Sequence, residues 1–221
     1  GRLWLSHYGK GVKCFDQNYR LLHEYNSKNS AMYNDAVIQM AEWDNTIWFA
    51  SDGGGLQVIW PETNRMQVFS NRLSDQFPAS SIACLCPSNE NIWVGTVHEG
   101  VLNIESGFMT TYMKAAWRKT AGLSAKCTLC LWEDTDGRIW IGTDGGGVNS
   151  YDQKTQKFTH YPATFNEKIV SLCPLSEQEL LVSCYQKGLF RFNKKSGALT
   201  PFALPNPTAE QEMKDVGVPV N

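Results

Sequence analysis

The sequence lacks three features that would place it in common classes of protein. Its 221 residues carry 20 Lys and Arg against 22 Asp and Glu, so no basic stripe of the kind that nucleic-acid binding needs is present. No apolar run approaches the roughly 20 residues of a membrane span, and no signal peptide is visible. These absences predict no nucleic-acid partner and no direct membrane insertion by this segment. The first residue is Gly rather than Met, which predicts excision from a longer protein.

Cysteine and histidine patterns predict no redox centre and no metal site. Seven cysteines cannot all pair within one chain, and the Cys127-Thr-Leu-Cys130 spacing falls in a predicted strand, where positions three apart point to opposite faces. We expect the seven to be largely reduced, buried thiols that pack as small apolar side chains. The four histidines are His7, His23, His98 and His160, and no pair has metal-ligand spacing. We therefore expect no metal and no cofactor.

One motif occurs five times and predicts a repeat architecture. A Trp, or Leu181 in the last copy, is followed seven residues later by a Gly. The Trp positions are Trp4, Trp48, Trp93 and Trp140, and the Gly positions are Gly11, Gly55, Gly100, Gly147 and Gly188. A large apolar residue lies four positions after each Gly, at Phe15, Ile59, Ile104, Tyr151 and Phe192. A closing aromatic follows at Tyr25, Phe69, Tyr112, Tyr161 and Phe202, which is 14 residues after the Gly in four copies and 12 in the third.

Each repeat reads as four short strands, and the fourth copy is the clearest. We predict an inner strand over 126–132, a second strand over 138–143, a third over 147–151 and an outer strand over 157–161. Such units recur every 41–47 residues with no helical period between them, which is typical of the blades of a β-propeller. We predict an all-β fold with no helix longer than two turns, in which Trp48, Trp93 and Trp140 are buried and equivalent.

The repeats predict a single β-propeller domain, or a fragment of one, over residues 1–221. The repeats cover approximately 1–25, 35–69, 80–112, 125–161 and 168–202, so about five blades are expected, four of them intact. The first copy begins inside its first hairpin and lacks an inner strand. The tail 203–221 either supplies that strand and closes a five-bladed ring or starts the next inner strand in an arc of a larger ring.

The stretch from Asp134 to Asp152 resembles the two-component regulator propeller repeat. It reads Asp-x-x-Gly-x-Ile-Trp-Ile-Gly-Thr-Asp-Gly-Gly-Gly-Val-x-x-Tyr-Asp, and the second repeat is closely similar. The resemblance implies seven-bladed propellers, often two in tandem, that form the periplasmic sensor of Bacteroides-type hybrid two-component histidine kinases and detect oligosaccharides. This chain has about five blades and no membrane segment or kinase, so any signalling output belongs to a parent protein.

Residues that break the repeat on one face are the candidate ligand site. Propeller ligands usually meet a face built from the second turn of each blade and the linkers between blades, where loops on a rigid scaffold concentrate function. The linkers are predicted over 26–35, 70–80, 113–125 and 162–168. The candidates there are Tyr8, His98, Tyr185, Trp117 and Arg118, whose aromatic and polar groups suit a sugar.

The sequence predicts binding rather than catalysis. Asp52 and Asp144 begin Gly-rich turns without a following helix, and Asp134 and Asp136 lack the remaining ligands of a calcium loop. No catalytic constellation can be named from spacing, so we expect no enzyme activity in this segment. The leading hypothesis is a periplasmic, oligosaccharide-responsive sensor that also contacts the rest of its parent protein. The alternatives are a protein-interaction or homodimerisation scaffold and a propeller glycoside hydrolase or lyase.

Overall fold

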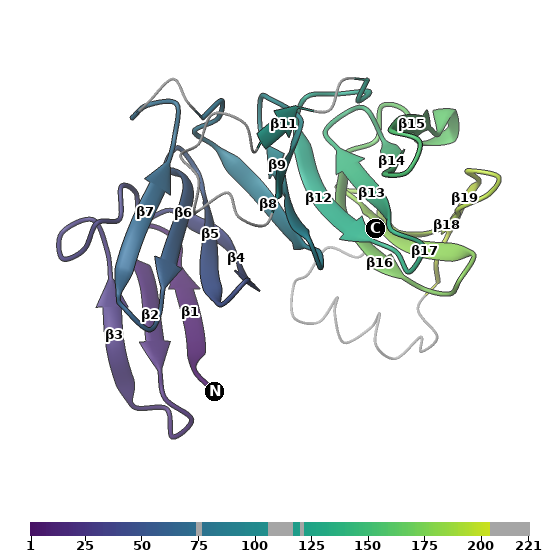
Figure 1. Cartoon of the computed structure of the whole chain (residues 1–221). Helices are drawn as coiled ribbons and strands as arrows, with labels where there is room; N and C mark the ends of the chain where they lie inside the picture. Colours follow the sequence, from purple (N-terminus) through teal and green to yellow (C-terminus); the bar gives the residue numbers. More distant parts are fainter. Residues whose placement is uncertain (74–76, 106–116, 120–121, 204–221) are drawn as a thin grey trace. The chain divides into compact units, whose positions relative to one another are not determined.

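The described part of the chain is built almost entirely from antiparallel β-sheet. The computed structural model describes residues 1–73, 77–105, 117–119 and 122–203 (Figure 1). These residues form five sheets, the first with three strands and the others with four. The one helix among them is the single 3-10 turn η1 (Pro162–Thr164). The prediction of an all-β fold with four intact blades and an incomplete first blade is therefore confirmed.

Each sheet is one blade, and its strands follow one another in chain order. The first blade contains β1 (Leu3–His7), β2 (Gly11–Phe15) and β3 (Leu21–Tyr25), and the second contains β4 (Val37–Trp43), β5 (Thr46–Ser51), β6 (Gly55–Trp60) and β7 (Arg65–Phe69). The third contains β8 (Ile82–Pro87), β9 (Asn91–Thr96), β10 (Val101–Glu105) and β11 (Trp117–Lys119). The fourth contains β12 (Thr128–Glu133), β13 (Arg138–Thr143), β14 (Val148–Asp152) and β15 (Lys157–His160), and the fifth contains β16 (Ile169–Pro174), β17 (Glu179–Cys184), β18 (Gly188–Asn193) and β19 (Leu199–Pro201).

The chain contacts divide the structure into two compact units. The first unit is Gly1–Gly122 with Lys126–Thr128, and the second is Leu123–Ala125 with Leu129–Asn221. The first three blades thus lie in the first unit, and the last two blades, apart from Thr128, lie in the second. Each unit is described separately below.

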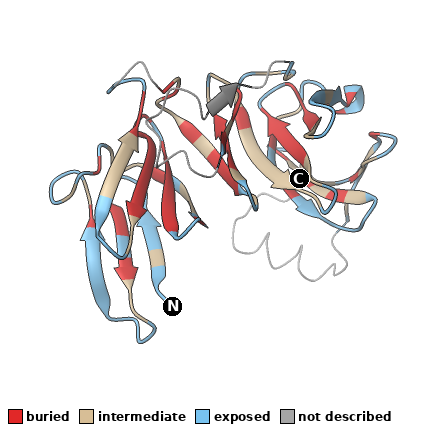
Figure 2. Cartoon of the chain, viewed as in Figure 1, coloured by how far each residue is buried: buried red, intermediate tan, exposed pale blue. Residues whose placement is uncertain are grey.

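The repeated Trp residues are core residues of the blades. Trp48, Trp93 and Trp140 are each at most 2% exposed, as predicted, and each lies opposite the residue three positions after its repeat Gly. Trp4 is half-buried and occupies the same register position. In the second unit, Trp140 stacks on Tyr161 and meets Phe192 of the fifth blade edge-on at 5.8 Å between ring centroids. Figure 2 shows that the buried positions concentrate on strands such as β5 and β6, whose two faces are both covered.

In the third and fourth blades, the penultimate residue of the second strand is a Gly, and its lack of a side chain leaves room for neighbouring atoms. At Gly142, an added Cβ atom would lie 2.4 Å from Cys130 Sγ and 2.7 Å from Ile169 Cγ2, the latter on the fifth blade. Gly95 meets Cys84 Sγ in the same way at 2.3 Å. Cys84 and Cys130 therefore occupy equivalent positions, as the repeat predicts, and their sulfur atoms fill the space that a side chain on the Gly would need.

The third repeat departs from the prediction at its outer strand. The spacing to Tyr112 predicts that this residue closes the blade, but β10 pairs with Trp117–Lys119, so that Leu102 lies opposite Lys119. The corresponding pair in the fourth blade is Asn149 with His160. The outer strand therefore begins later than the repeat spacing predicts, and the predicted linker 113–125 is wrong over 117–119. Tyr112 itself lies outside the described residues.

The first blade exposes apolar side chains that are buried in the other blades. Leu3 and Leu5 are 40% and 51% exposed, whereas Ile139 and Ile141, at the same repeat positions, are fully buried. Strand β1 pairs with β2 and is one of the two edge strands of this three-stranded sheet, the other being β3. The predicted role of the tail as an inner strand falls on 204–221, outside the described residues.

All seven cysteines are thiols rather than disulfides, but they differ in burial. Cys14, Cys84, Cys86 and Cys184 are buried, Cys127 and Cys130 are half-buried, and Cys173 is exposed. The prediction of uniformly buried thiols is therefore wrong for Cys173, which lies on the open face of β16. Cys127 precedes β12 rather than lying in it, because the strand starts at Thr128.

Thiol labelling of the folded protein should follow these environments. Burial raises the pKa of Cys130 to about 12, and burial with the nearby Glu167 charge raises that of Cys184 to about 11. Since the thiolate is the nucleophile, we expect iodoacetamide at pH 8 to modify Cys173 well before Cys130 and Cys184. Peptide mass spectrometry of a time course measures this order. Equal labelling rates for Cys130 and Cys173 would contradict the burial of the Cys130 sulfur.

Candidate functional site

The first residue of the second turn varies between the repeats and is exposed in four of the five blades. It lies three residues before the repeat Gly and is Tyr8, Asp52, Val97, Asp144 or Tyr185 in the five copies. The repeat Gly itself has a positive φ in every blade, from 68° at Gly147 to 90° at Gly188. A left-handed residue at that point closes the turn and leaves the position three residues earlier free to vary.

Linker residues hold the second turns in place through backbone hydrogen bonds. In the first unit, the carbonyl of Asp35 accepts bonds from the N–H groups of Gly9 and Gly11, and the carbonyl of Ala36 accepts one from Asp52. In the second unit, the N–H of Tyr185 donates to the carbonyl of Lys168. The linker that ends at each inner strand therefore lies against the turns of two neighbouring blades.

In the first unit, Tyr8, Asp52 and Ser81 form a cluster that we call the first-unit cluster. The Tyr8 hydroxyl donates to Asp52 Oδ2 at 3.1 Å, and the Ser81 hydroxyl donates to Asp52 Oδ1 at 3.3 Å. Ser81 Oγ also accepts from the N–H of Gly53. The hydrogen bond to Asp52, together with its negative charge, raises the pKa of the Tyr8 phenol above its usual range. Tyr8 is 63% exposed, so its ring face is open to solvent.

In the second unit, Asp144, Lys168 and Tyr185 form the second-unit cluster. The Lys168 ammonium lies 2.9 Å from Asp144 Oδ2 and 5.2 Å from the centre of the Tyr185 ring. Tyr185 is 55% exposed. Behind this cluster, Lys187 pairs with Glu167 at 2.6 Å. Each cluster thus combines one exposed aromatic ring with one carboxylate from the same turn position of the neighbouring blade.

The other predicted site residues have different outcomes. His98 is exposed in the second turn of the third blade, but it makes no contact with Tyr8 or Asp52 that the structure records. Trp117 and Arg118 lie on the outer strand β11 rather than in a linker, and their side chains are outside the described residues. Sequence reasoning missed Ser81, Lys168 and the role of Asp52 and Asp144, which it assigned to turn geometry alone. The occurrence of either Tyr or Asp three residues before the repeat Gly was the sequence feature that could have indicated these Asp residues.

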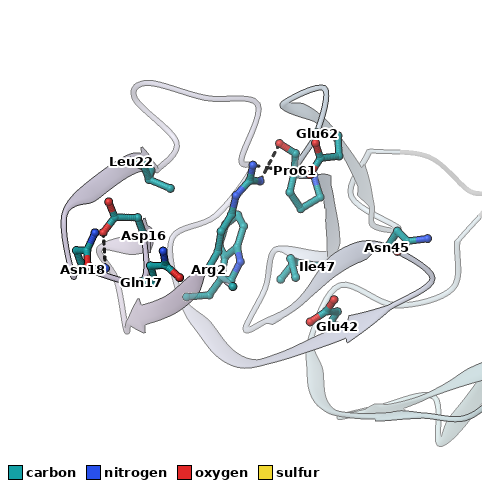
Figure 3. Close-up of a pocket in the computed structure, with 12 residues that line it drawn as sticks. Arg2, Asp16, Gln17, Asn18, Leu22, Glu42, Asn45, Ile47, Pro61 and Glu62 are labelled. Carbon is teal, nitrogen blue, oxygen red and sulfur yellow. Dashed lines mark hydrogen bonds and ion pairs between the residues drawn. The ribbon is translucent and has the colours of Figure 1, made fainter.

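Two clefts lie at the other end of the strands, and the predicted ligand residues are absent from their linings. In the first unit, a cavity of about 740 Å³ is bounded by the start of β1 and by turns that precede β5, follow β2 and follow β6 (Figure 3). Arg2 crosses it and donates from Nη1 to the carbonyl of Pro61 at 3.1 Å, with Glu62 at 3.7 Å. First and third turns lie opposite second turns in an antiparallel blade, so this cavity faces away from the first-unit cluster.

The second unit has a cavity of about 1110 Å³ at the equivalent place between the fourth and fifth blades. Lys194 lies over the rings of Trp132 and Trp140 there, at 4.8 and 5.9 Å from their centres. Asp134 accepts from Trp140 Nε1 and from the N–H groups of Asp136 and Arg138, so this carboxylate fixes the first turn. In the parts of the chain that the structure describes, no three His, Cys, Asp or Glu residues are placed to hold a metal ion.

Comparisons with known proteins agree with this fold. The family model for the two component regulator propeller matches residues 122–145, which overlap the first part of the stretch on which the resemblance rests. No curated protein matches the sequence. Within the described ranges, no helix is long and apolar enough to span a membrane.

Solved structures resemble the chain along nearly its whole length at low sequence identity. The extracellular domain of hybrid two component system BT4673 from B. thetaiotaomicron has a TM-score of 0.68 at 19% identity, over 93% of this chain and 28% of that one. PorZ, a surface component of the type-IX secretion system of Porphyromonas gingivalis, has a TM-score of 0.71 at 14% identity, over 94% and 33%. The designed Ika8 protein has a TM-score of 0.64 at 14% identity, over 87% and 55%. The chain therefore spans about a third of the length of the natural proteins it resembles.

Proposed function

We propose that this chain is a non-catalytic sensor segment of a hybrid two-component regulatory protein and that it binds an oligosaccharide on its second-turn face. The regulator repeat at 122–145 and the likeness to an extracellular domain of a hybrid two component system support the sensor assignment. The same likeness supports a place outside the cytoplasm, in the periplasm, as part of an inner-membrane protein. Signalling output and further ligand contacts belong to the parent protein.

The observation that carries the ligand assignment is the pairing of an exposed Tyr with an Asp in both units. A sugar ring offers an apolar C–H face and a rim of hydroxyl groups. The exposed ring of Tyr185 can contact the C–H face of the sugar. The Asp144 carboxylate and the Lys168 ammonium offer an acceptor and a donor for its hydroxyl groups. Tyr8 and Asp52 offer the same pair of groups in the first unit.

Substitutions in the second-unit cluster should weaken sugar binding. We expect Tyr185→Ala and Asp144→Asn each to weaken the binding of a hexasaccharide by about tenfold, which corresponds to ~1.4 kcal/mol. Calorimetric titration of the wild-type chain and both variants measures this loss, and chromatography of the mixtures checks for sugar products.

Tyr19→Ala is the matched control, because Tyr19 is 78% exposed in the turn between β2 and β3, at the opposite end of its blade. Its affinity should equal that of the wild type. An equal loss in the Tyr19 variant would move the site to the cavity end of the blades. Accumulating cleavage products would instead indicate a glycoside hydrolase or lyase.

A protein-interaction scaffold is the second candidate, and the open face of the first blade favours it. Leu3, Leu5 and Leu21 are 40–51% exposed on that face. Such a surface could pack against the parent protein or against a second copy in a homodimer. Sedimentation of wild-type chain and Leu5→Ser over a range of concentrations distinguishes association through this face from a monomer.

A further inference from the structure

Three inner strands carry the same irregularity next to the second-turn face. The register of β4 on β5 skips one residue between Val37 and Gln39, and that of β16 on β17 skips one between Ile169 and Ser171. Strand β8 has the same skip between Ile82 and Cys84. The unopposed residues are Ile38, Ala83 and Val170. A bulge re-aims the side chain of its extra residue, and bulges recur next to binding sites.

Each of these bulges lies two residues after a linker residue that belongs to a polar cluster or hydrogen-bonds to it. Ile38 is two residues after Ala36, whose carbonyl accepts from the N–H of Asp52. Val170 is two residues after Lys168, which pairs with Asp144 and lies over Tyr185. The same spacing from linker to bulge therefore occurs beside the cluster of each unit.

Two of the three bulged side chains, Ile38 and Val170, are apolar and exposed, whereas Ala83 is half-buried. Ile38 is 48% exposed and Val170 is 37% exposed, whereas Val37 and Ile169, one residue earlier, are 3% and 0% exposed. The first residue of each of these two inner strands is therefore part of the buried core. Nothing in the packing of either blade requires a β-branched apolar side chain at the next position, because it contributes little to the buried clusters.

We propose that Ile38 and Val170 are specificity-determining contacts, each of which receives the apolar face of a sugar bound at the cluster of its own unit, and this inference rests on the proposed function. Carboxylate and ammonium groups exchange hydrogen bonds to water for hydrogen bonds to hydroxyls, so only part of each bond's energy adds to affinity. Binding sites gain most from apolar contact around a few placed polar groups. The bulge residue supplies that contact beside each cluster and selects neutral oligosaccharides whose rings have an uninterrupted C–H face.

The test compares serine substitutions at matched exposed positions. Ile38→Ser and Val170→Ser are titrated against cellohexaose, xylohexaose, mannohexaose and galactohexaose, beside Leu21→Ser and Leu175→Ser as controls. Leu21 and Leu175 are 51% and 38% exposed, and they lie on the outer strand of the first blade and after β16, away from both clusters. All four variants should unfold at nearly the wild-type midpoint, because exposed substitutions change stability little.

We expect the bulge variants to bind the preferred hexasaccharide at least fivefold more weakly than wild type, the control variants to bind normally, and Ile38→Val and Val170→Ile to retain affinity. If the wild type binds a hexasaccharide and the bulge variants bind it equally well, the contact assignment fails while the proposed function stands. If the controls weaken as much as the bulge variants, the assignment also fails. If the wild type binds none of the four sugars, both this inference and the proposed ligand class are overturned.

Discussion

Replacing Trp48 with alanine is expected to lower the free energy of unfolding of the first unit by about 3–5 kcal/mol. The indole is fully buried in the cluster that joins the second and third blades, where it meets Trp43 edge-on at 5.5 Å. Its Nε1 donates to Thr46 Oγ1 at 2.6 Å, so the substitution removes both packing and a buried hydrogen bond. Urea unfolding followed by fluorescence measures the change.

Trp4→Ala is the matched control for this prediction. Trp4 holds the same repeat position in the first blade but is half-buried, so its truncation removes less contact area. We expect less than half of the loss seen for Trp48. A near-neutral midpoint for Trp48→Ala, or equal losses at the two positions, would contradict the assignment of the repeated Trp as a core residue.

Gly147→Ala is expected to destabilise the second unit by roughly 2–5 kcal/mol. Its φ of +68° costs an L-residue about 1–2 kcal/mol, and overpacking a filled site costs roughly 1–3 kcal/mol more. The overpacking arises because a Cβ atom there would lie 2.2 Å from both the carbonyl oxygen and Oγ1 of Thr164. Thr164 Oγ1 also accepts from the N–H of Val148, so movement of the linker would break that bond. Thermal and urea unfolding of the variant measure the loss.

Gly145→Ala separates the two causes within the same turn. Gly145 has a φ of +83°, yet no atom lies within 4 Å of an added Cβ. It should therefore show the backbone cost alone, about 1–2 kcal/mol. Equal losses at Gly145 and Gly147 would mean that the contact with Thr164 contributes nothing.

The fold was predicted well from the sequence where the same residue type packs in the same way in several blades. The second strand of the fourth blade was placed at 138–143 and lies at Arg138–Thr143, because Trp140 and Gly142 recur in the third blade as Trp93 and Gly95 with equivalent neighbours. The third blade was misjudged at Tyr112, since its outer strand begins later than the repeat spacing predicts. The number of residues between two motif positions locates a strand only where the loop between them has the same length in each repeat.

The site was harder to predict because its members come from different segments. Tyr8 and Tyr185 were found as departures from the repeat, but their partners Asp52 and Asp144 match it and looked purely structural. Lys168 closes a linker, and only the fold brings it to Asp144 and Tyr185. The bulges at Ile38 and Val170 depend on strand register, which side-chain alternation alone does not fix.

The position three residues before the repeat Gly also bears on how such a chain diversifies. It holds Tyr, Asp, Val, Asp and Tyr in the five blades, while the Gly that shapes the turn is constant. Codons for Tyr and Asp differ in one first-position base, and codons for Asp and Val differ in one second-position base. A single point mutation can therefore exchange an aromatic ring, a carboxylate or an apolar side chain on this face while the core of the blade is inherited unchanged.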